Sequence, residues 1–186
     1  MKQVSLLVFF LTLFACNKEY TPENKIIEDV SYLADDKLEG RKTGTEGEKK
    51  AAEYIANRFK SLGLEGRGTN GYFQDFTFKP KKDPHSEVKF TETNSDSTIT
   101  GRNILGFLDN NSSQTIVIGA HFDHLGYGSE GSLYEGEEKL IHNGADDNGS
   151  GTSTVIGVAE AFMDAKNKGV GPRRSVLTML VTGEEP

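Results

Sequence analysis

The chain has 186 residues, of which 35% are hydrophobic, and this length suits one domain with its own apolar core better than two. Its formal charge is −7, and its lysines and arginines form no clustered stripe, which argues against binding to nucleic acid phosphates. The expected partners are therefore small or protein-like molecules.

The first sixteen residues have the pattern of an export signal. Lys2 precedes an apolar stretch from Val4 to Phe14, which is too short for a membrane-spanning helix. The ending "LFAC" resembles the lipobox of bacterial lipoproteins, so we predict a signal peptide over residues 1–15 and a lipid anchor on Cys16. A plain secretory signal is the alternative. The protein is predicted to be exported and attached to the periplasmic or cell-surface side of a membrane only through this lipid.

Two helices are predicted near the start of the mature chain. A polar tether over residues 16–24 leads into a single domain over residues 25–186. The first helix begins with Thr21 as its cap, and the second begins at a capping box formed by Thr45 and Glu48. Their apolar positions recur at helical spacing, so both helices are expected to pack against the rest of the domain.

The rest of the chain is predicted to alternate between strands and a helix. Alternating residues predict a strand from Tyr72 to Phe78, which "EVKFTET" and "STIT" continue weakly. Stronger apolar patterns of buried strands occur in "NILGFL", "QTIVIGAHFDH" and "SVLTMLV". A helix from near Ser150 to Gly169 separates the last two and implies a right-handed crossover between parallel strands. The predicted fold class is α/β, with a mixed, mainly parallel sheet that helices cover on both faces.

Ionisable residues gather where these strands end and where the helix begins. In an open α/β sheet, reactive groups collect beyond the carboxyl ends of strands. Each group alone is common in turns and helix caps, but together they supply nitrogen and oxygen ligands for Zn²⁺ or a similar dication, plus a carboxylate that can accept a proton from water. Because Cys16 is the only cysteine, no thiolate ligand competes with them. The groups are His121, Asp123 and His124, then Asp146 and Asp147, then Glu184 and Glu185.

The motifs "AHFDHLG", "NGADDNGSG" and "TGEE", in this order, resemble those of peptidase family M28, whose members are mostly aminopeptidases with co-catalytic zinc ions. The upstream stretch "LEGRKTGTEGEKKAAEYIANRF" also resembles the region that precedes these motifs in that family. The resemblance implies a three-layer αβα fold, a peptide substrate and two Zn²⁺ ions in the complete site.

The resemblance also implies roles for particular residues. His121 would ligate one zinc ion, Glu185 would ligate the other, and Asp147 would bridge both. Glu184 would be the general base, and Asp123 would orient the imidazole of His121.

Three further features complete these expectations. The resemblance implies a cis peptide bond between Asp147 and Asn148, and structural roles are expected for His124 and His142. The family pattern has two more ligands after "GEE", an Asp and a His, which this sequence lacks. We therefore expect the N-terminal part of a longer protein, inactive by itself, in which "SVLTMLV" has an unpaired edge.

Two other functions remain open. Glutaminyl cyclases resemble family M28 but use a single zinc ion for an intramolecular acyl transfer, although the complete "HFD", "ADDNGSG" and "GEE" set favours a peptidase. A non-catalytic surface lipoprotein that keeps the fold as a binding module is the third possibility. The sequence carries no signal for an oligomeric state.

Overall fold

The computed structural model describes residues 21–80, 88–92, 95, 97–128 and 131–185. The predicted signal peptide and its lipid-anchored Cys16 lie outside the described residues. None of the helices in this part of the chain combines the length and the hydropathy that a bilayer crossing requires.

The three long helices begin and end close to the predicted positions. They are α1 (Pro22–Leu33), α2 (Glu46–Leu62) and α3 (Gly151–Asn167). The hydroxyl of Thr21 accepts a backbone N–H from the first turn of α1, and Gly63 ends α2 in the left-handed region with φ 82°. Because α1 begins at Pro22, it includes the last residues of the predicted tether.

Six strands form one mixed sheet, in which β1 pairs with β4 and the others follow the order β3, β2, β4, β6, β5. Strands β5 and β6 are parallel, and the other pairings among the described residues are antiparallel. The α/β class is therefore confirmed, whereas a mainly parallel sheet is wrong for this part of the chain. A parallel pair needs a long crossover, which only α3 supplies here. The strands are β1 (Glu65–Gly66), β2 (Phe73–Lys79), β3 (Lys89–Phe90), β4 (Ile99–Leu108), β5 (Thr115–His121) and β6 (Ser175–Val181).

The position of β6 differs from the prediction. It pairs with β4 on one side and with β5 on the other, so the expected unpaired edge of "SVLTMLV" is wrong. In the described sheet, β5 is the edge strand beside β6. The segments "STIT" and "NILGFL" join into the single strand β4, and β3 keeps only two residues of "EVKFTET".

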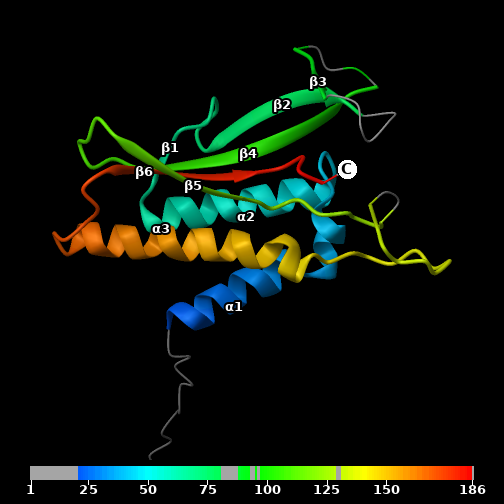
Figure 1. The fold of residues 1–186 in the computed structure, drawn as a ribbon, viewed down its shortest axis with the longest axis horizontal. Coiled ribbons are helices and arrows are strands. Elements are labelled where there is room, and N and C mark those ends of the chain that lie inside the picture. Colours follow the sequence, from blue (N-terminus) through cyan, green and yellow to red (C-terminus); the bar gives the residue numbers. More distant parts are fainter. Residues whose placement is uncertain (1–20, 81–87, 93–94, 96, 129–130, 186) are drawn as a thin grey trace, which may run out of the picture.

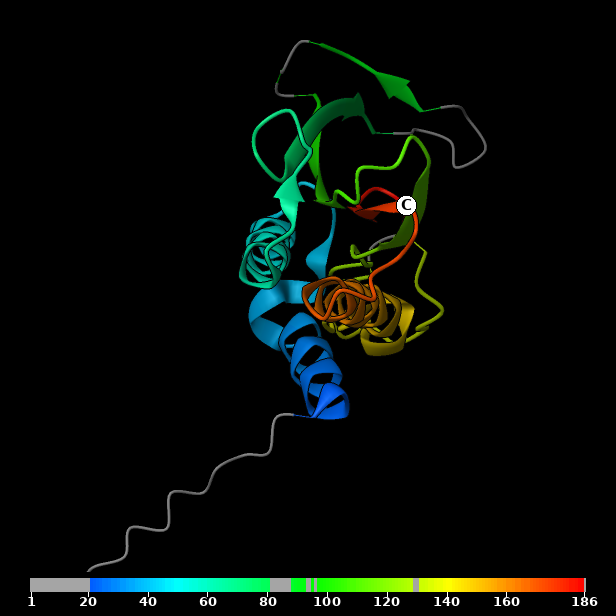
Figure 2. The same cartoon turned by 90° about the vertical axis from the view of Figure 1, so that its left-hand side faces the viewer.

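All three long helices lie on one side of the described sheet (Figures 1 and 2). Helices α2 and α3 lie side by side against the strands, and α1 packs against α3 on the side away from the sheet. The predicted cover of helices on both faces is therefore not present among the described residues. Ile118 and Ala120 of β5 pack against the core, while Val117 points the other way and is 57% exposed.

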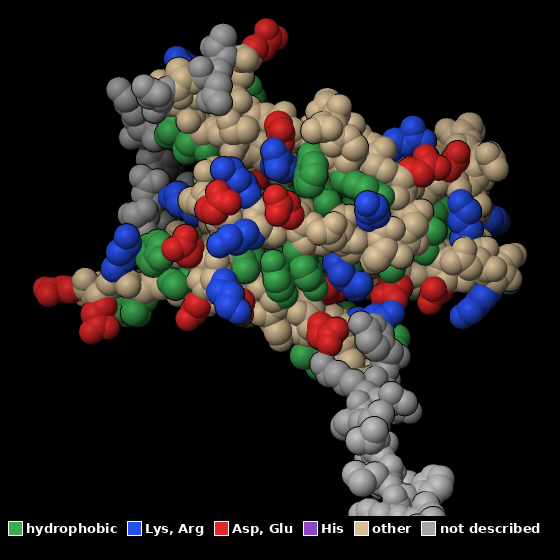
Figure 3. Space-filling view, turned by 180° about the vertical axis from the view of Figure 1, so that it is seen from behind, with side chains coloured by type: hydrophobic (Ala, Val, Ile, Leu, Met, Phe, Trp, Pro, Cys, Tyr) green, Lys and Arg blue, Asp and Glu red, His purple; other side chains and the backbone are tan. Residues whose placement is uncertain are grey.

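The core lies between the sheet and the pair α2 and α3. Phe59 of α2 packs so closely on Gly106 of β4 that a Cβ at this glycine would stand 2.7 Å from the ring. Figure 3 shows the surface from behind, where acidic and basic side chains are interspersed and small apolar areas lie between them. Other fully buried core side chains are Leu33, Ile55, Ile104, Ile156 and Leu180.

Candidate metal centre

Three connections at one end of the sheet carry the candidate residues. His121 is the last residue of β5, and Glu184 and Glu185 follow the end of β6. Asp147 lies in the turn η2 (Ala145–Ser150), directly before α3. Because β5 and β6 are parallel neighbours, their carboxyl ends lie together, and α3 starts beside them.

His121 is the centre of the first group of side chains. Its Nε2 lies 3.1 Å from Oδ1 of Asp147 and 3.8 Å from Oε2 of Glu184. Its Nδ1 faces Asp123, at 3.3 Å from the backbone oxygen and 3.6 Å from Oδ1. Asp123 above all, and also Glu184 and Asp147, raise the pKa of His121 to about 9, against the opposing effect of burial. A cation bound at Nε2 would therefore replace a proton.

Asp123 is fully buried and connects the loop after β5 to the loop after β6. Its Oδ2 accepts hydrogen bonds from Thr43 Oγ1 at 3.0 Å and from the backbone N–H groups of Gly183 at 2.9 Å and Glu185 at 3.2 Å. Its Oδ1 has no hydrogen-bond partner among the described residues and faces His121. One carboxylate thus holds the glutamate loop and presents a free oxygen to the imidazole.

A second group contains His124, for which the sequence analysis expected a structural role. Nδ1 of His124 lies 3.1 Å from Oε1 of Glu185. His124, Asp147 and Glu185 each offer a donor atom, and these atoms lie within 4.8 Å of one another. Among the described residues, these three form a group compact enough to hold one metal ion.

The two groups share Asp147, so the candidate residues do converge. The predicted neighbours His121, Asp147 and Glu184 are brought together, and Glu185 joins Asp147 in the second group. The peptide bond between Asp147 and Asn148 is cis, as the resemblance implies. The donor set of imidazole and carboxylate groups, with a buried carboxylate behind one imidazole, fits Zn²⁺.

Arg41 holds the segment after β5 and the segment before η2 through hydrogen bonds to their backbones. The sequence analysis did not identify this residue. This buried guanidinium donates hydrogen bonds to the backbone oxygens of Phe122 at 2.6 Å, Asn143 at 2.6 Å and Gly144 at 2.9 Å, and also to that of Leu33. It therefore ties the end of α1 to the segments that carry His121 and Asp147.

The charge on Arg41 persists despite its burial. Desolvation lowers its pKa to about 10, and the nearby carboxylates of Asp123 and Asp147 oppose that change. The guanidinium stays charged at neutral pH and adds positive potential near the carboxylates of Asp123 and Asp147. The one signal for it in the sequence is the polar stretch "EGRKTGT", which looks like a turn because its partners Phe122, Asn143 and Gly144 lie far away in the chain.

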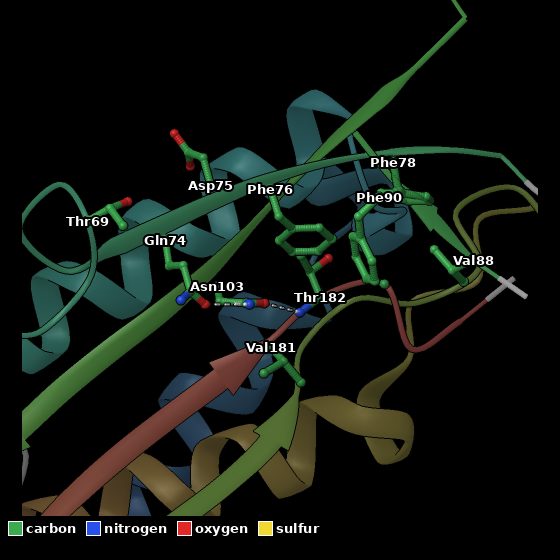
Figure 4. Close-up of a pocket in the computed structure, with 11 residues that line it drawn as sticks. Thr69, Gln74, Asp75, Phe76, Phe78, Val88, Phe90, Asn103, Val181 and Thr182 are labelled. Carbon is green, nitrogen blue, oxygen red and sulfur yellow. Dashed lines mark hydrogen bonds between the residues drawn. The ribbon is translucent and has the colours of Figure 1, made fainter. Parts of the chain in front are cut away.

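A pocket of about 550 Å³ opens on the face of the sheet opposite the helices (Figure 4). The rings of Phe76 and Phe90 meet edge to face with centroids 6.0 Å apart, and Val181 lies below them. On the polar side, Asn103 donates to Gln74 at 3.1 Å. Because Gly183 also lines the pocket, this largely apolar hollow adjoins the chain segment that carries Glu184.

This fold and this donor set define an α/β protein with a candidate metal centre at the carboxyl ends of β5 and β6. The family model for peptidase family M28 matches residues 103–186, which contain all three motifs. The match confirms the resemblance to family M28 over that part of the chain. None of the curated proteins that were compared matches the chain significantly.

Solved structures support the same fold. The leucine aminopeptidase precursor from Bacteroides thetaiotaomicron matches with TM-score 0.62 and 15% identity over 87% of this chain and 47% of its own. The glutaminyl cyclase from the same species matches with TM-score 0.63 and 16% identity over 88% and 47%. A Zn-dependent exopeptidase from Parabacteroides distasonis matches with TM-score 0.59 and 19% identity over 86% and 44%. The chain thus spans about half the length of these structures.

Proposed function

We propose that this chain belongs to a metal-dependent exopeptidase of the aminopeptidase type, with two zinc ions in its complete site. His121, Asp147 and Glu185 serve as ligands in this proposal, and Glu184 serves as the general base. The observation that supports it most is the approach of His121 Nε2 to both Asp147, at 3.1 Å, and Glu184, at 3.8 Å. This approach supports the proposal because it brings the carboxylate of Glu184, which follows β6, close to the imidazole of His121 at the end of β5.

In this proposal, Glu184, Asp123 and His121 have different roles in hydrolysis. Zinc, when bound, would supply Lewis acidity toward a peptide carbonyl and toward water. The side chain of Glu184 is 60% exposed, so it can accept a proton from water and pass it to the leaving amine. Asp123 keeps Nδ1 of His121 occupied, which directs Nε2 toward Asp147.

Other parts of the proposal concern the whole protein. We propose export and attachment through a lipid on Cys16, with a peptide as substrate. The 186 residues contain three of the five ligands that the resemblance implies.

The test uses the complete reading frame that contains this sequence. Hydrolysis of an aminoacyl reporter should stop on chelation and return with Zn²⁺. Glu184→Gln should lower kcat by about 10²–10⁴-fold and leave the zinc content unchanged, because the change removes a base and keeps the ligands. Glu135→Gln, an exposed carboxylate outside the site, is the control. Full activity of Glu184→Gln would refute the assignment of the base.

A glutaminyl cyclase-like acyl transfer is the second candidate. Its support is that the fold matches a glutaminyl cyclase with TM-score 0.63, beside 0.62 for the aminopeptidase precursor. Ring closure of a peptide with N-terminal glutamine, without hydrolysis of the aminoacyl reporter, would favour the cyclase. A non-catalytic binding module would catalyse neither reaction, and Glu184→Gln would not change its binding.

A further inference from the structure

His124 occupies a position for which neither the resemblance nor the expected hydrolysis supplies a role. We propose that His124 is a metal ligand, and that His124, Asp147 and Glu185 together bind one divalent transition metal ion within this chain. The inference rests on the proposed function, because it shares the ligands Asp147 and Glu185 with it. It adds a histidine of this chain to the ligands of the ion beside Glu185.

The surrounding structure holds the ring of His124 in place. Its backbone N–H donates to the backbone oxygen of Arg41 at 3.3 Å, which anchors the loop that follows β5. The ring lies against Gly144, where an added Cβ would stand 2.5 Å from Cγ of His124. The backbone of Gly144 has φ 57°, a left-handed conformation that glycine adopts without strain. With 12% of its side chain exposed, His124 is fixed before any ligand arrives.

The distances suit a shared ion. Zinc bonds to nitrogen and oxygen are about 2.0–2.2 Å long, so two donors of one tetrahedral ion lie roughly 3.4 Å apart. Nδ1 of His124 and Oε1 of Glu185 are already 3.1 Å apart. The third donor, Asp147, lies within 4.8 Å of both, and its side chain is 64% exposed. Because this carboxylate is exposed, it can move toward the other two donors without a change in the core.

The charges and donor types suit such an ion as well. Two carboxylates and one neutral imidazole balance the charge of a dication, and this nitrogen and oxygen set suits Zn²⁺ or Co²⁺. His121 does not compete for the same position, because its Nε2 faces Asp147 and Glu184. Each histidine is thus paired with a different glutamate, and Asp147 is common to both pairs.

Cobalt spectroscopy tests whether residue 124 touches the metal. His124→Cys is introduced into the 186-residue chain with Cys16→Ser, so that the new thiol is the only one. Addition of Co²⁺ should produce the near-ultraviolet charge-transfer band of a thiolate bound to cobalt. The matched control is His142→Cys, because His142 contacts Ser132 outside the group, and it should give no such band. Cobalt binding by His124→Cys without the band would overturn the inference.

Calorimetry with Zn²⁺ then separates a ligand from an orienting residue. Loss of an orienting partner costs about 10–100-fold in metal affinity, so His124→Gln should weaken binding by more than that, while His142→Gln should bind like the unmodified chain. Circular dichroism of each metal-free variant checks that it is folded.

The outcomes distinguish this inference from the proposed function. If Asp147→Asn and Glu185→Gln abolish Zn²⁺ binding but His124→Gln does not weaken it, the inference fails and the proposed ligands stand. If Asp147→Asn and Glu185→Gln also leave the affinity unchanged, both fail. If the unmodified chain binds no Zn²⁺, the inference fails, and the activity of the complete reading frame decides the proposed function.

Discussion

The buried carboxylate of Asp123 accepts the backbone N–H of Glu185 at 3.2 Å, so the loop after β5 holds the loop after β6 in position. The same oxygen accepts the N–H of Gly183 at 2.9 Å, and the other oxygen faces Nδ1 of His121 at 3.6 Å. A single buried group therefore sets the positions of one candidate histidine ligand and one candidate glutamate ligand.

Replacing this carboxylate should weaken metal binding as well as the fold. In Asp123→Asn, one oxygen becomes an NH₂ group, which cannot accept from a backbone N–H or from an imidazole N–H. We expect the Zn²⁺ affinity to fall by about 10–100-fold and the free energy of unfolding to fall by roughly 1–3 kcal/mol. Calorimetry and urea unfolding measure the two effects. Asp164→Asn, exposed on α3, should change neither, and an unchanged Zn²⁺ affinity in Asp123→Asn would contradict its positioning role.

Arg41 should resist even conservative replacement. Its buried, planar guanidinium donates to four backbone oxygens. The single ammonium group of lysine cannot reproduce this arrangement of donors. Arg41→Lys is expected to lower the free energy of unfolding by about 3 kcal/mol or more, because buried carbonyl groups lose their donors. Urea unfolding measures it, with the exposed Arg174→Lys as the control. A loss below about 1 kcal/mol would show that water replaces the guanidinium without cost.

A largely buried ion pair joins α1 to α2. Asp29 accepts from Arg58 Nε at 2.8 Å and from the hydroxyl of Tyr54 at 2.5 Å. Asp29→Asn should lower the free energy of unfolding by about 3 kcal/mol. This value is at the low end for breaking a buried ion pair, because Arg58 still has the carboxylate of Glu160 at 3.8 Å as a partner. A double-mutant cycle with Arg58→Met isolates the pair in urea unfolding. A coupling energy near zero would mean that packing alone joins the two helices.

Local signals in the sequence predicted the helices and the candidate residues. Thr21 and Gly63 act within a few residues of themselves, so a helix start and a helix end can be read without knowledge of the fold. His121 and Glu184 could be selected because each follows an apolar strand pattern. Their roles as ligand and base stay predictions.

Long-range pairing could not be read in the same way. The place of β6 in the middle of the sheet depends on register with β4, such as Ile104 opposite Leu180, and nothing near either residue encodes it. His124 stands in an ordinary loop, and its partner Glu185 is 61 positions away. The partners of Arg41 are backbone oxygens, which carry no residue identity, so its burial leaves no pattern in the sequence.

Glu48 shows how a helix cap can acquire a second function. The predicted capping box forms only in part, because Thr45 accepts the N–H of Glu48 at 3.4 Å while the carboxyl of Glu48 turns inward. There it accepts the backbone N–H of Arg102 at 3.1 Å and joins α2 to β4. Burial is the main cause that raises the pKa of Glu48 from 4.5 to about 7.

This raised pKa predicts a stability that falls with rising pH. Between pH 4.5 and about 7, the folded protein keeps a proton on Glu48 that the unfolded chain has released. The contribution is therefore fully present below pH 4.5 and is lost as the pH rises through about 7. Since one pKa unit corresponds to about 1.4 kcal/mol, the loss at pH 8 amounts to roughly 3 kcal/mol.

Glu48→Gln should remove this dependence, because the amide stays neutral and its oxygen can still accept from Arg102. Relative to the unmodified protein, the variant should be more stable at pH 8 by up to roughly 3 kcal/mol, and the difference should shrink to near zero at about pH 4. Urea unfolding at both pH values measures it. Glu53→Gln, on the exposed side of α2, should show no such change between the two pH values. If Glu48→Gln is less stable than the unmodified protein at pH 8, the carboxylate must be ionised and well paired in the fold, and burial is not the dominant influence on it.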